Sequence, residues 1–517
     1  MELMAPGSRV PPDVDHYGRL LAFEQSQTRR RGQHRQARYL ENRRYYYGEH
    51  DDPTNVQQPL DIRYVPRIID KHAHYLWGEW ERDIINWTVT PRDDDLPEEI
   101  LERIGRALYA LMRRTNANDV LRRGSLDGGI YGDTVFKLRF QPTVGAIIEA
   151  VLPEYYHARW HPLDVSETLE ACIAYPLDRG TARRLFGTGG AAPGSYRHGA
   201  LDPELVVVWE WWSQEETILA VDDIVVTHLA NPYVAAPGRP AWLPFIHIPN
   251  LQLNGEYYGF GDAEGVHALQ DELNLRLADL GDIVNYHAHP ITLIKNVFGR
   301  SKEDFEVGPD KIWDLGRDGE AEYLQWSGTP PSVFEYIELV LRVLFDTASL
   351  TPVAFGRVGQ SQTTGSALVM QMLPVIEVAR RKRLTWTPRL SRLARCLLEL
   401  ELMGLTEPRF RERWGFGLAE LDKVEIHPKW APILPRDRVN IVNENVTLLV
   451  NKARSVLRAL EDLGEDDPQR ERDRIIADLR ELGSLALAMK ASESELLPNR
   501  EGGKNSDRAG AAGSLEP

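Results

Sequence analysis

Cysteine is scarce in this sequence, and long apolar runs do not occur in it. Only two cysteines, Cys172 and Cys396, stand among its 517 residues. We therefore expect no disulfide framework and a reducing cytoplasm as the place of folding. No stretch of about 18 apolar residues occurs, which argues against a membrane span. The polar segment Met1–His16 lacks the apolar core of a secretory signal.

The sequence also contains fewer basic residues than acidic ones, 61 against 77. The formal net charge at pH 7 is −16, whereas proteins that grip DNA without sequence preference are usually basic, because binding phosphates releases counterions. An acidic chain therefore either avoids DNA or handles it without holding it. With 42% hydrophobic and 27% charged residues, the chain is expected to be globular, with about two to four cooperating domains.

The common sequence motifs of catalysis are missing. There is no GxxxxGK(S/T) phosphate loop, no HExxH, no CxxC and no nucleophile elbow, so we predict no catalytic residues, no cofactor and no bound metal. His72 and His74 are two positions apart, as are His287 and His289, and this spacing would point them away from each other on a helix. We interpret them as surface or packed residues.

The first half of the sequence predicts a mixture of helices and strands. Charge pattern and capping favour helices over Glu24–Tyr47 and Leu96–Thr115. A glycine- and alanine-rich mobile loop is expected at Gly187–Gly194. Trp209, Trp211 and Trp212 could stack on bases, but packing in a core explains them more simply. Alternation predicts strands over Thr134–Phe140, Ala146–Leu152, Leu205–Trp212 and Thr217–Thr227.

The segment Gly261–His289 predicts a long helix with one acidic face. Glu264, Asp271 and Asp282 fall nearly opposite its apolar stripe, and Glu272 and Asp279 lie beside them. Such carboxylates could bind metal or act in acid–base chemistry, although a solvated helix face is the simpler interpretation. The apolar residues recur at steps of three and four: Val266, Leu269, Leu273, Leu277, Leu280 and Val284.

After residue 289 the sequence alternates between segments with strand-like and helix-like patterns of apolar residues. The polar stretch Thr351–Gly365 predicts a loop that leads into a long helix, Ser366–Met403, in which Pro374 and Pro388 predict kinks. A polar, disordered tail is expected from Ser492. The remaining expectations are strands at Ile291–Val297, Lys311–Leu315, Ala321–Trp326 and Val424–Pro435, and helices at Val333–Leu350, Val439–Leu463 and Asp467–Leu482.

Two arginine-rich runs, within residues 29–44 and 380–395, stand out against the acidic total. Phosphate contact is one interpretation. Ion pairing within or between subunits is another, because both runs lie on charged helices with nearby glutamates.

The order of these parts resembles the portal proteins of long-tailed, double-stranded DNA bacteriophages. The resemblance extends over Glu24–Leu482 and rests on order and spacing, with no single diagnostic motif; the loop near Gly190 and the polar tail depart from it. The strings similar to this family are YYYGEH at Tyr45–His50, GFGDAEGVHALQDELNLRLADL at Gly259–Leu280, TTGSAL at Thr363–Leu368 and PILPRDR at Pro432–Arg438.

The resemblance implies an α+β, predominantly helical portal fold that assembles as a ring. Its regions would be an N-terminal wing (1–258), a first stem helix (259–289), a clip (290–332), a second stem helix (333–350), a tunnel loop (351–365), a long kinked helix returning to the wing (366–438), crown helices (439–491) and a disordered tail (492–517).

The implied function is that of a head–tail connector and not of an enzyme. A ring of about twelve subunits at one capsid vertex would pass double-stranded DNA during packaging and ejection. It would reside in the virion after synthesis in the host cytoplasm. Its partners would be the terminase motor, the major capsid and scaffolding proteins, and head-completion or adaptor proteins, with no membrane. The alternatives are a metal-dependent nucleic-acid-processing enzyme and another structural connector ring.

Two sets of residues would then line the DNA channel. The acidic stem, Glu264, Asp271, Glu272, Asp279 and Asp282, would repel phosphates so that DNA slides. The tunnel loop would touch DNA at the narrowest point with weak, neutral hydrogen bonds and a single charge. An ordinary exposed turn is the alternative, although helix–helix connections are usually about two to eight residues long. The loop residues are Gly356, Arg357, Gly359, Gln360, Ser361, Gln362, Thr363 and Thr364.

Overall fold

The computed structural model divides the chain into two compact units. The first comprises Met1–Leu434 and the second Pro435–Pro517. The described residues are 4–11, 15–28, 35–49, 62–79, 84–92, 96–190, 204–234, 241–288, 291–296, 305, 315, 318–324, 331–357, 365–404, 409, 413–434, 438–463, 465 and 468–495.

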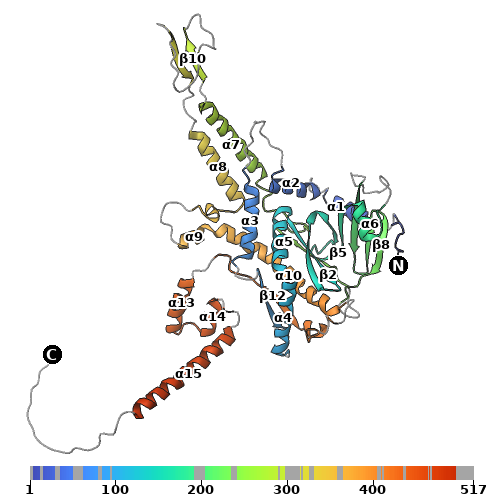
Figure 1. Ribbon diagram of the computed structural model, residues 1–517, viewed down its shortest axis with the longest axis vertical. Helices are drawn as coiled ribbons and strands as arrows, with labels where there is room; N and C mark the ends of the chain where they lie inside the picture. The colour runs from blue at the N-terminus through green and yellow to red at the C-terminus, as the bar shows by residue number, and fades with distance from the viewer. Residues whose placement is uncertain are drawn as a thin grey trace, which may run out of the picture. The chain divides into compact units, whose positions relative to one another are not determined.

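A five-stranded antiparallel sheet forms one part of the first unit (Figure 1). Helix α1 (His16–Thr28) covers one face, where Leu20 packs with Trp209 and Trp211, and α6 (Arg179–Phe186) covers the other over Val206 and Val208. The three tryptophans are at most 6% exposed, which confirms them as core residues. The strands follow in the order β4 (Tyr156–Trp160), β5 (Thr168–Asp178), β6 (Leu205–Trp212), β7 (Glu216–Val221) and β8 (Ile224–Ala230).

The single strand expected at Thr217–Thr227 is wrong, because β7 and β8 form a hairpin there. Asp222 turns the chain with a φ of +52°, and its carbonyl accepts a hydrogen bond from Trp209 Nε1 at 2.7 Å. Aspartate is one of the few residues besides glycine that tolerate this left-handed conformation. Because apolar residues stand on both sides of this short turn, the alternation of apolar and polar residues in the sequence does not reveal it.

The largest core joins four helices to a smaller sheet. Trp77 and Trp386 meet edge to face at its centre, with 5.2 Å between ring centroids. The helices are α3 (Tyr64–Trp77), α4 (Glu98–Arg114), α5 (Ala117–Tyr131) and α10 (Leu373–Met403). The sheet order is β3 (Gly145–Val151), β2 (Asp133–Gln141) and β9 (Phe245–Pro249), and β1 (Asn86–Pro91) pairs separately with β12 (Val424–Lys429). Two short helical turns, η2 (Pro153–Tyr155) and α12 (Leu418–Leu421), complete this part.

A pair of helices projects from this body and carries a small β-hairpin at its end (Figure 1). The helices are α7 (His267–Ala288) and α8 (Pro331–Thr347), and the hairpin pairs β10 (Ile291–Lys295) with β11 (Glu320–Leu324). Helix α7 begins at His267, whereas the sequence predicted a helix from Gly261.

The helix expected from Ser366 is divided in the structure into α9 (Gly365–Gln371) and α10. The helix expected over Glu24–Tyr47 overlaps α1 and α2 (Arg35–Tyr47), and residues 29–34 between them lie outside the described residues. Pro374 falls in the first turn of α10, where a missing N–H loses no helical hydrogen bond. Pro388 lies inside α10 without ending it.

The second unit contains three helices within its described residues: α13 (Arg438–Val450), α14 (Val456–Leu463) and α15 (Pro468–Glu495). The single helix expected over Val439–Leu463 is wrong. A turn in which Lys452 has a φ of +54° separates α13 from α14. Helix α15 continues past Leu482, where the prediction ended it, as far as Glu495. The disordered tail expected from Ser492 is therefore wrong for Ser492–Glu495, which are helical.

Both cysteines are free and buried, Cys172 in β5 and Cys396 in α10. Burial raises the pKa of the Cys396 thiol to about 12, and it raises the pKa of Cys172 well above its usual range. The chain is a mixed α and β protein with more helix than strand. No helix in the described ranges is long and apolar enough to span a membrane.

Several expected features fall partly or wholly outside the described residues. Among them are the loop Gly187–Gly194 beyond Gly190, the strand Lys311–Leu315 apart from Leu315, the ends of the strands expected at Ile291–Val297 and Ala321–Trp326, the tunnel-loop positions 358–364, and the tail beyond Glu495.

Candidate functional site

The predicted acidic face belongs to the helix pair α7–α8. The two helices contact through apolar side chains, of which Leu273, Ile337, Val340 and Leu344 are buried. Leu269, Leu277, Leu280 and Leu341 extend the same cluster. Four members of the expected stripe, Leu269, Leu273, Leu277 and Leu280, thus pack in this cluster. Val266 is buried ahead of the helix, and Val284 is 56% exposed, so the stripe ends before the outer end of α7.

Glu272 and Asp279 share one arginine on this side of α7. Arg276 donates from Nε to Glu272 at 2.8 Å and from Nη1 to Asp279 at 3.0 Å. Glu272 also accepts a hydrogen bond from the Tyr336 hydroxyl of α8 at 3.0 Å. The hydrogen bond from Arg276 lowers the pKa of Glu272. Glu272 is therefore anionic at neutral pH, and Arg276 offsets negative charge on this side of the helix.

Glu264 does not lie on α7, so the prediction of one helical stripe that includes it is wrong. It stands in the turn ahead of the helix, where its carboxylate accepts hydrogen bonds from the Gly261 N–H at 2.7 Å and from Asn42 Nδ2 at 3.0 Å. Arg38 Nε is 3.5 Å away. Burial raises the pKa of Glu264 in spite of Arg38. These contacts with α2 hold the segment out of the helix.

Asp271 and Asp282 occupy opposite ends of the acidic side. Asp271, near the base of α7, accepts a hydrogen bond from the Tyr45 hydroxyl of α2 at 2.5 Å. The Tyr45 ring in turn stacks on His267, with 3.9 Å between centroids. Asp282, near the outer end, makes no ion pair with any residue that the structure describes. The outer part of α7 is consequently where Asp279 and Asp282 present negative charge to solvent.

A buried ion pair fastens the base of the helix pair to the long helix α10. Lys382 Nζ lies 2.6 Å from an oxygen of Asp262, and both side chains are at most 2% exposed. Asn250 Nδ2 donates to Asp262 at 2.8 Å, and His72 Nδ1 lies 3.5 Å away. Burial alone would raise the pKa of Asp262, but Lys382 and His72 hold it well below its usual range.

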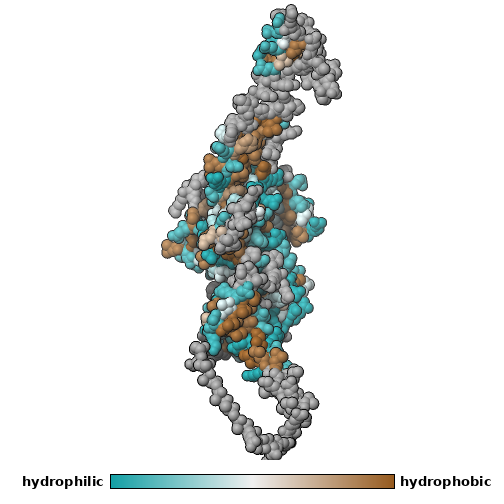
Figure 2. Space-filling model, turned by 90° about the vertical axis from the view of Figure 1, so that its left-hand side faces the viewer, coloured by the Kyte–Doolittle hydropathy of each residue, from teal (hydrophilic) through white to brown (hydrophobic). Residues whose placement is uncertain are grey.

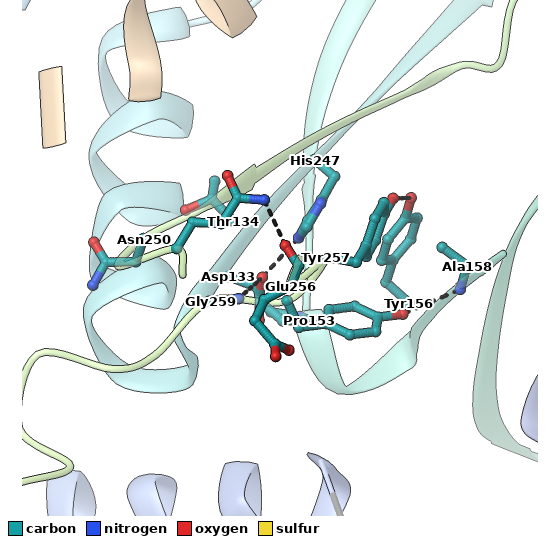
Figure 3. Close-up of polar contacts among 12 residues, drawn as sticks. Asp133, Thr134, Pro153, Tyr156, Ala158, His247, Asn250, Glu256, Tyr257 and Gly259 are labelled. Atoms are coloured by element: carbon teal, nitrogen blue, oxygen red, sulfur yellow. Dashed lines mark hydrogen bonds and ion pairs between the residues drawn. The ribbon is translucent and has the colours of Figure 1, made fainter. Parts of the chain in front are cut away.

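A second buried carboxylate, Asp133 at the start of β2, anchors the segment that leads to α7 (Figure 3). It accepts hydrogen bonds from His247 Nε2 at 2.7 Å, from the Gly259 N–H at 3.0 Å and from the Tyr39 hydroxyl. Burial lowers the pKa of His247. A Cβ atom on Gly259 would lie 2.4 Å from the carbonyl oxygen of Gly132, so only glycine permits this approach of the two backbones.

A third buried carboxylate, Glu24 of α1, joins α1, α2 and β4. Arg35 Nη2 donates to Glu24 at 2.9 Å, His157 Nδ1 lies 2.9 Å from the same oxygen, and the Tyr258 hydroxyl donates to the other. Sequence reasoning missed all three buried carboxylates. The partners of Asp262, Asp133 and Glu24 lie up to 234 residues away along the chain, and the one local signal is a lysine, Lys382, on the apolar side of α10.

The predicted tunnel loop begins with an ordered turn. The 3₁₀ turn η4 (Pro352–Phe355) packs on the end of α8, where Phe355 and Phe345 have centroids 5.1 Å apart. Gly356 follows with a φ of +76°, and Arg357 is exposed. The loop residues Gly359, Gln360, Ser361, Gln362, Thr363 and Thr364 lie outside the described residues.

Several residues of the arginine-rich runs are paired within the chain. On α10, Arg380 pairs with Glu377 at 2.8 Å and Arg395 with Asp422 at 2.5 Å. On α2, Arg43 pairs with Glu154 at 3.0 Å. These contacts favour ion pairing over phosphate binding for Arg380, Arg395 and Arg43. In the part of the chain that the structure describes, no three His, Cys, Asp or Glu side chains could together hold a metal ion.

Comparison with known proteins gives no family for this chain. No protein-family model matches the sequence, and a search of curated proteins finds no significant match.

Proposed function

We propose that the chain is the subunit of a portal ring of a tailed double-stranded DNA bacteriophage, the channel through which DNA enters and leaves the capsid. The observation that carries this proposal is the projecting pair α7–α8 with a β-hairpin at its end, followed by a polar segment and the 31-residue helix α10. This is the stem, clip, stem, tunnel-loop and long-helix order of the family that the sequence resembles. The β10–β11 hairpin would receive the packaging motor and later the head-completion proteins.

A row of exposed apolar residues on α8, which we call the α8 row, supports assembly. Tyr336, Leu339 and Val343 recur at steps of three and four and are 43%, 48% and 40% exposed. Figure 2 shows hydrophobic side chains on the surface of the helix pair. Exposed apolar patches of this kind mark surfaces that a partner covers. In a ring, each helix pair has an identical neighbour on either side, and the α8 row would pack there.

The charges on the outer helix pair support passage of DNA without binding. Asp279 and Asp282 on α7, together with exposed Glu335 and Glu338 on α8, present carboxylates to solvent. Repeated around a ring, they would repel phosphates at the short distances found in a narrow channel. The −16 net charge fits a protein that guides DNA and does not retain it.

Electron microscopy and mass photometry of the full-length chain test the proposal. We expect closed rings with an axial opening and a mass that is a whole multiple, near twelve, of one chain. The variant Leu339→Asp with Val343→Asp should fall apart into smaller species, because charges would be buried at the contact between subunits. The matched control, Glu335→Gln with Glu338→Gln, should still form rings. A stable monomer of the wild-type chain at all concentrations would contradict the proposal.

A further inference from the structure

A hollow lined by arginine and aromatic side chains lies on α4, an element that takes no part in the proposed channel. Its lining residues are Tyr109, Ala110, Arg113, Arg114, Arg413 and Trp414. A second hollow adjoins it and shares Tyr109 and Arg113. We call the lining of the first hollow the arginine–aromatic surface.

Two of its three guanidinium groups are available to a partner. Arg114 is engaged, because it donates to both oxygens of buried Glu401 at 3.0 and 2.7 Å. Arg113 and Arg413 are exposed, and neither forms an ion pair with a carboxylate among the described residues. In a chain with a net charge of −16, two cations without a described counterion in one hollow form a local site for negative charge.

Both free guanidinium groups are held beside aromatic rings. The Cζ atom of Arg113 lies 5.8 Å from the centroid of Tyr109, and that of Arg413 lies 4.9 Å from the centroid of Trp414. Cation–π contact of this kind restrains the guanidinium plane while leaving its N–H edge free for a carboxylate. Tyr109 is 50% exposed. Arginine, tyrosine and tryptophan are the residues that most often contribute the binding energy of protein interfaces, so this combination on a surface is typical of a docking site.

A glycine on the same side of α4 leaves room for a partner. Gly105 precedes Tyr109 by one helical turn, and a Cβ atom added there would meet no atom within 4 Å. Packing within this chain therefore does not require glycine, which is unfavourable inside a helix. A bare backbone beside Tyr109 allows another chain to approach the helix surface closely.

We propose that the arginine–aromatic surface docks an acidic peptide segment of a partner protein. Carboxylates of the segment bind the N–H edges of Arg113 and Arg413, and its apolar atoms pack on Tyr109 and Trp414. A peptide fits better than nucleic acid, because non-specific DNA binding draws on about 6–10 phosphate contacts along a basic stripe. This surface offers two cations in one hollow.

Fluorescence anisotropy with a fluorescein-labelled octaglutamate peptide tests the proposal on the full-length chain. We expect saturable binding that weakens with salt. Arg113→Gln with Arg413→Gln should weaken it by roughly tenfold or more, because charge-assisted hydrogen bonds are lost. The control Arg123→Gln with Arg159→Gln removes the same charge at positions 57% and 55% exposed. It should change the affinity by less than about twofold.

Three outcomes would overturn the proposal. The first is that the peptide does not bind the wild-type chain. The second is that both double variants lose the same amount of peptide affinity. The third is that a short labelled DNA duplex binds more tightly than the peptide and loses that binding only in the Arg113/Arg413 variant. The last result would reassign the surface to nucleic acid. The proposal does not depend on the channel, since rings can form whether or not the peptide binds.

Discussion

Glu24 holds its negative charge in the interior of the first unit, where three elements meet. Burial alone would raise the pKa of Glu24, but Arg35 and His157 lower it to about 2. The Glu24 and Arg35 side chains are 5% and 6% exposed, so each depends on the other for compensation of its charge. A buried pair of this kind contributes little compared with an apolar pair of the same shape, yet removing one partner is costly.

We predict that Glu24→Gln destabilises the chain by about 3–5 kcal/mol, because Arg35 would keep a buried charge without a carboxylate. Urea unfolding followed by circular dichroism measures the change. Glu41→Gln, at a carboxylate that is 49% exposed, is the matched control and should cost less than about 0.5 kcal/mol. Equal stability of the two variants would show that Glu24 does not compensate Arg35.

The same residue predicts a pH dependence. The pKa of Glu24 is lower in the folded chain, about 2, than the ordinary value of 4.5. Its contribution to stability is therefore complete above pH 4.5 and is lost as the pH falls towards 2. Between these values the wild-type free energy of unfolding should fall more steeply with decreasing pH than that of Glu24→Gln. Parallel curves would count against a lowered pKa.

At the scale of elements, the outer end of α7 is the part of the proposed stem where negative charge is most simply replaced by positive charge. Asp279→Lys with Asp282→Lys should leave rings intact, because neither side chain belongs to the apolar contact with α8. DNA translocation should slow severalfold at low salt and recover at higher salt, since phosphates would be attracted and then screened. A packaging assay at two salt concentrations measures this, with Glu425→Lys in β12 as control. Unchanged rates at low salt would contradict a channel-lining role.

The segment between η4 and α9 gives a second prediction at this scale. Deleting Gly359–Gln362 should allow rings to form but reduce packaging or retention of DNA. The reason is that the segment joins the end of α8 to α9 and would stand at the same height in every subunit. A packaged-DNA protection assay reports the loss. Normal packaging and retention would leave an ordinary connecting turn as the only interpretation.

Sequence periodicity predicts those elements whose pattern is continuous and unambiguous. The strand at Leu205–Trp212 has the predicted bounds, and α4 lies within its predicted range. The pattern fails where a short turn interrupts an apolar run, as at Asp222. It also fails where contacts between segments override helix propensity, as at Glu264, which Asn42 and Arg38 hold outside α7.

The buried carboxylates show a different limit of sequence reasoning. Asp133, Glu24 and Asp262 look like ordinary charged residues in the sequence, and their burial is decided by partners on other elements. Glu24 meets His157 across 133 residues, and Asp262 meets Lys382 across 120. No local pattern of charge specifies such pairs. The acidic side of α7, in contrast, is a local property of one helix, and four of its five predicted members do lie on that helix.

For the whole molecule, the proposed function requires a passage for DNA and does not require the protein itself to hydrolyse ATP. The sequence has no phosphate-binding loop, and the free energy for moving DNA would come from a separate ATP-hydrolysing partner. We predict that purified rings hydrolyse no ATP above background, with or without DNA, in a phosphate-release assay. An activity that co-purifies with the chain and disappears on substitution of a single carboxylate would contradict this prediction.

The burial of both cysteines has a practical consequence for such experiments. Cys172 and Cys396 are 0% and 6% exposed, and burial raises the pKa of each thiol, so neither should react with a maleimide in the native state. The wild-type chain therefore needs no removal of its own cysteines before a new one is introduced for labelling. One new cysteine at Leu163, which is 93% exposed and lies outside the α8 row, would place a single dye or spin label on each chain, and distances between labels would then report the symmetry of a proposed ring.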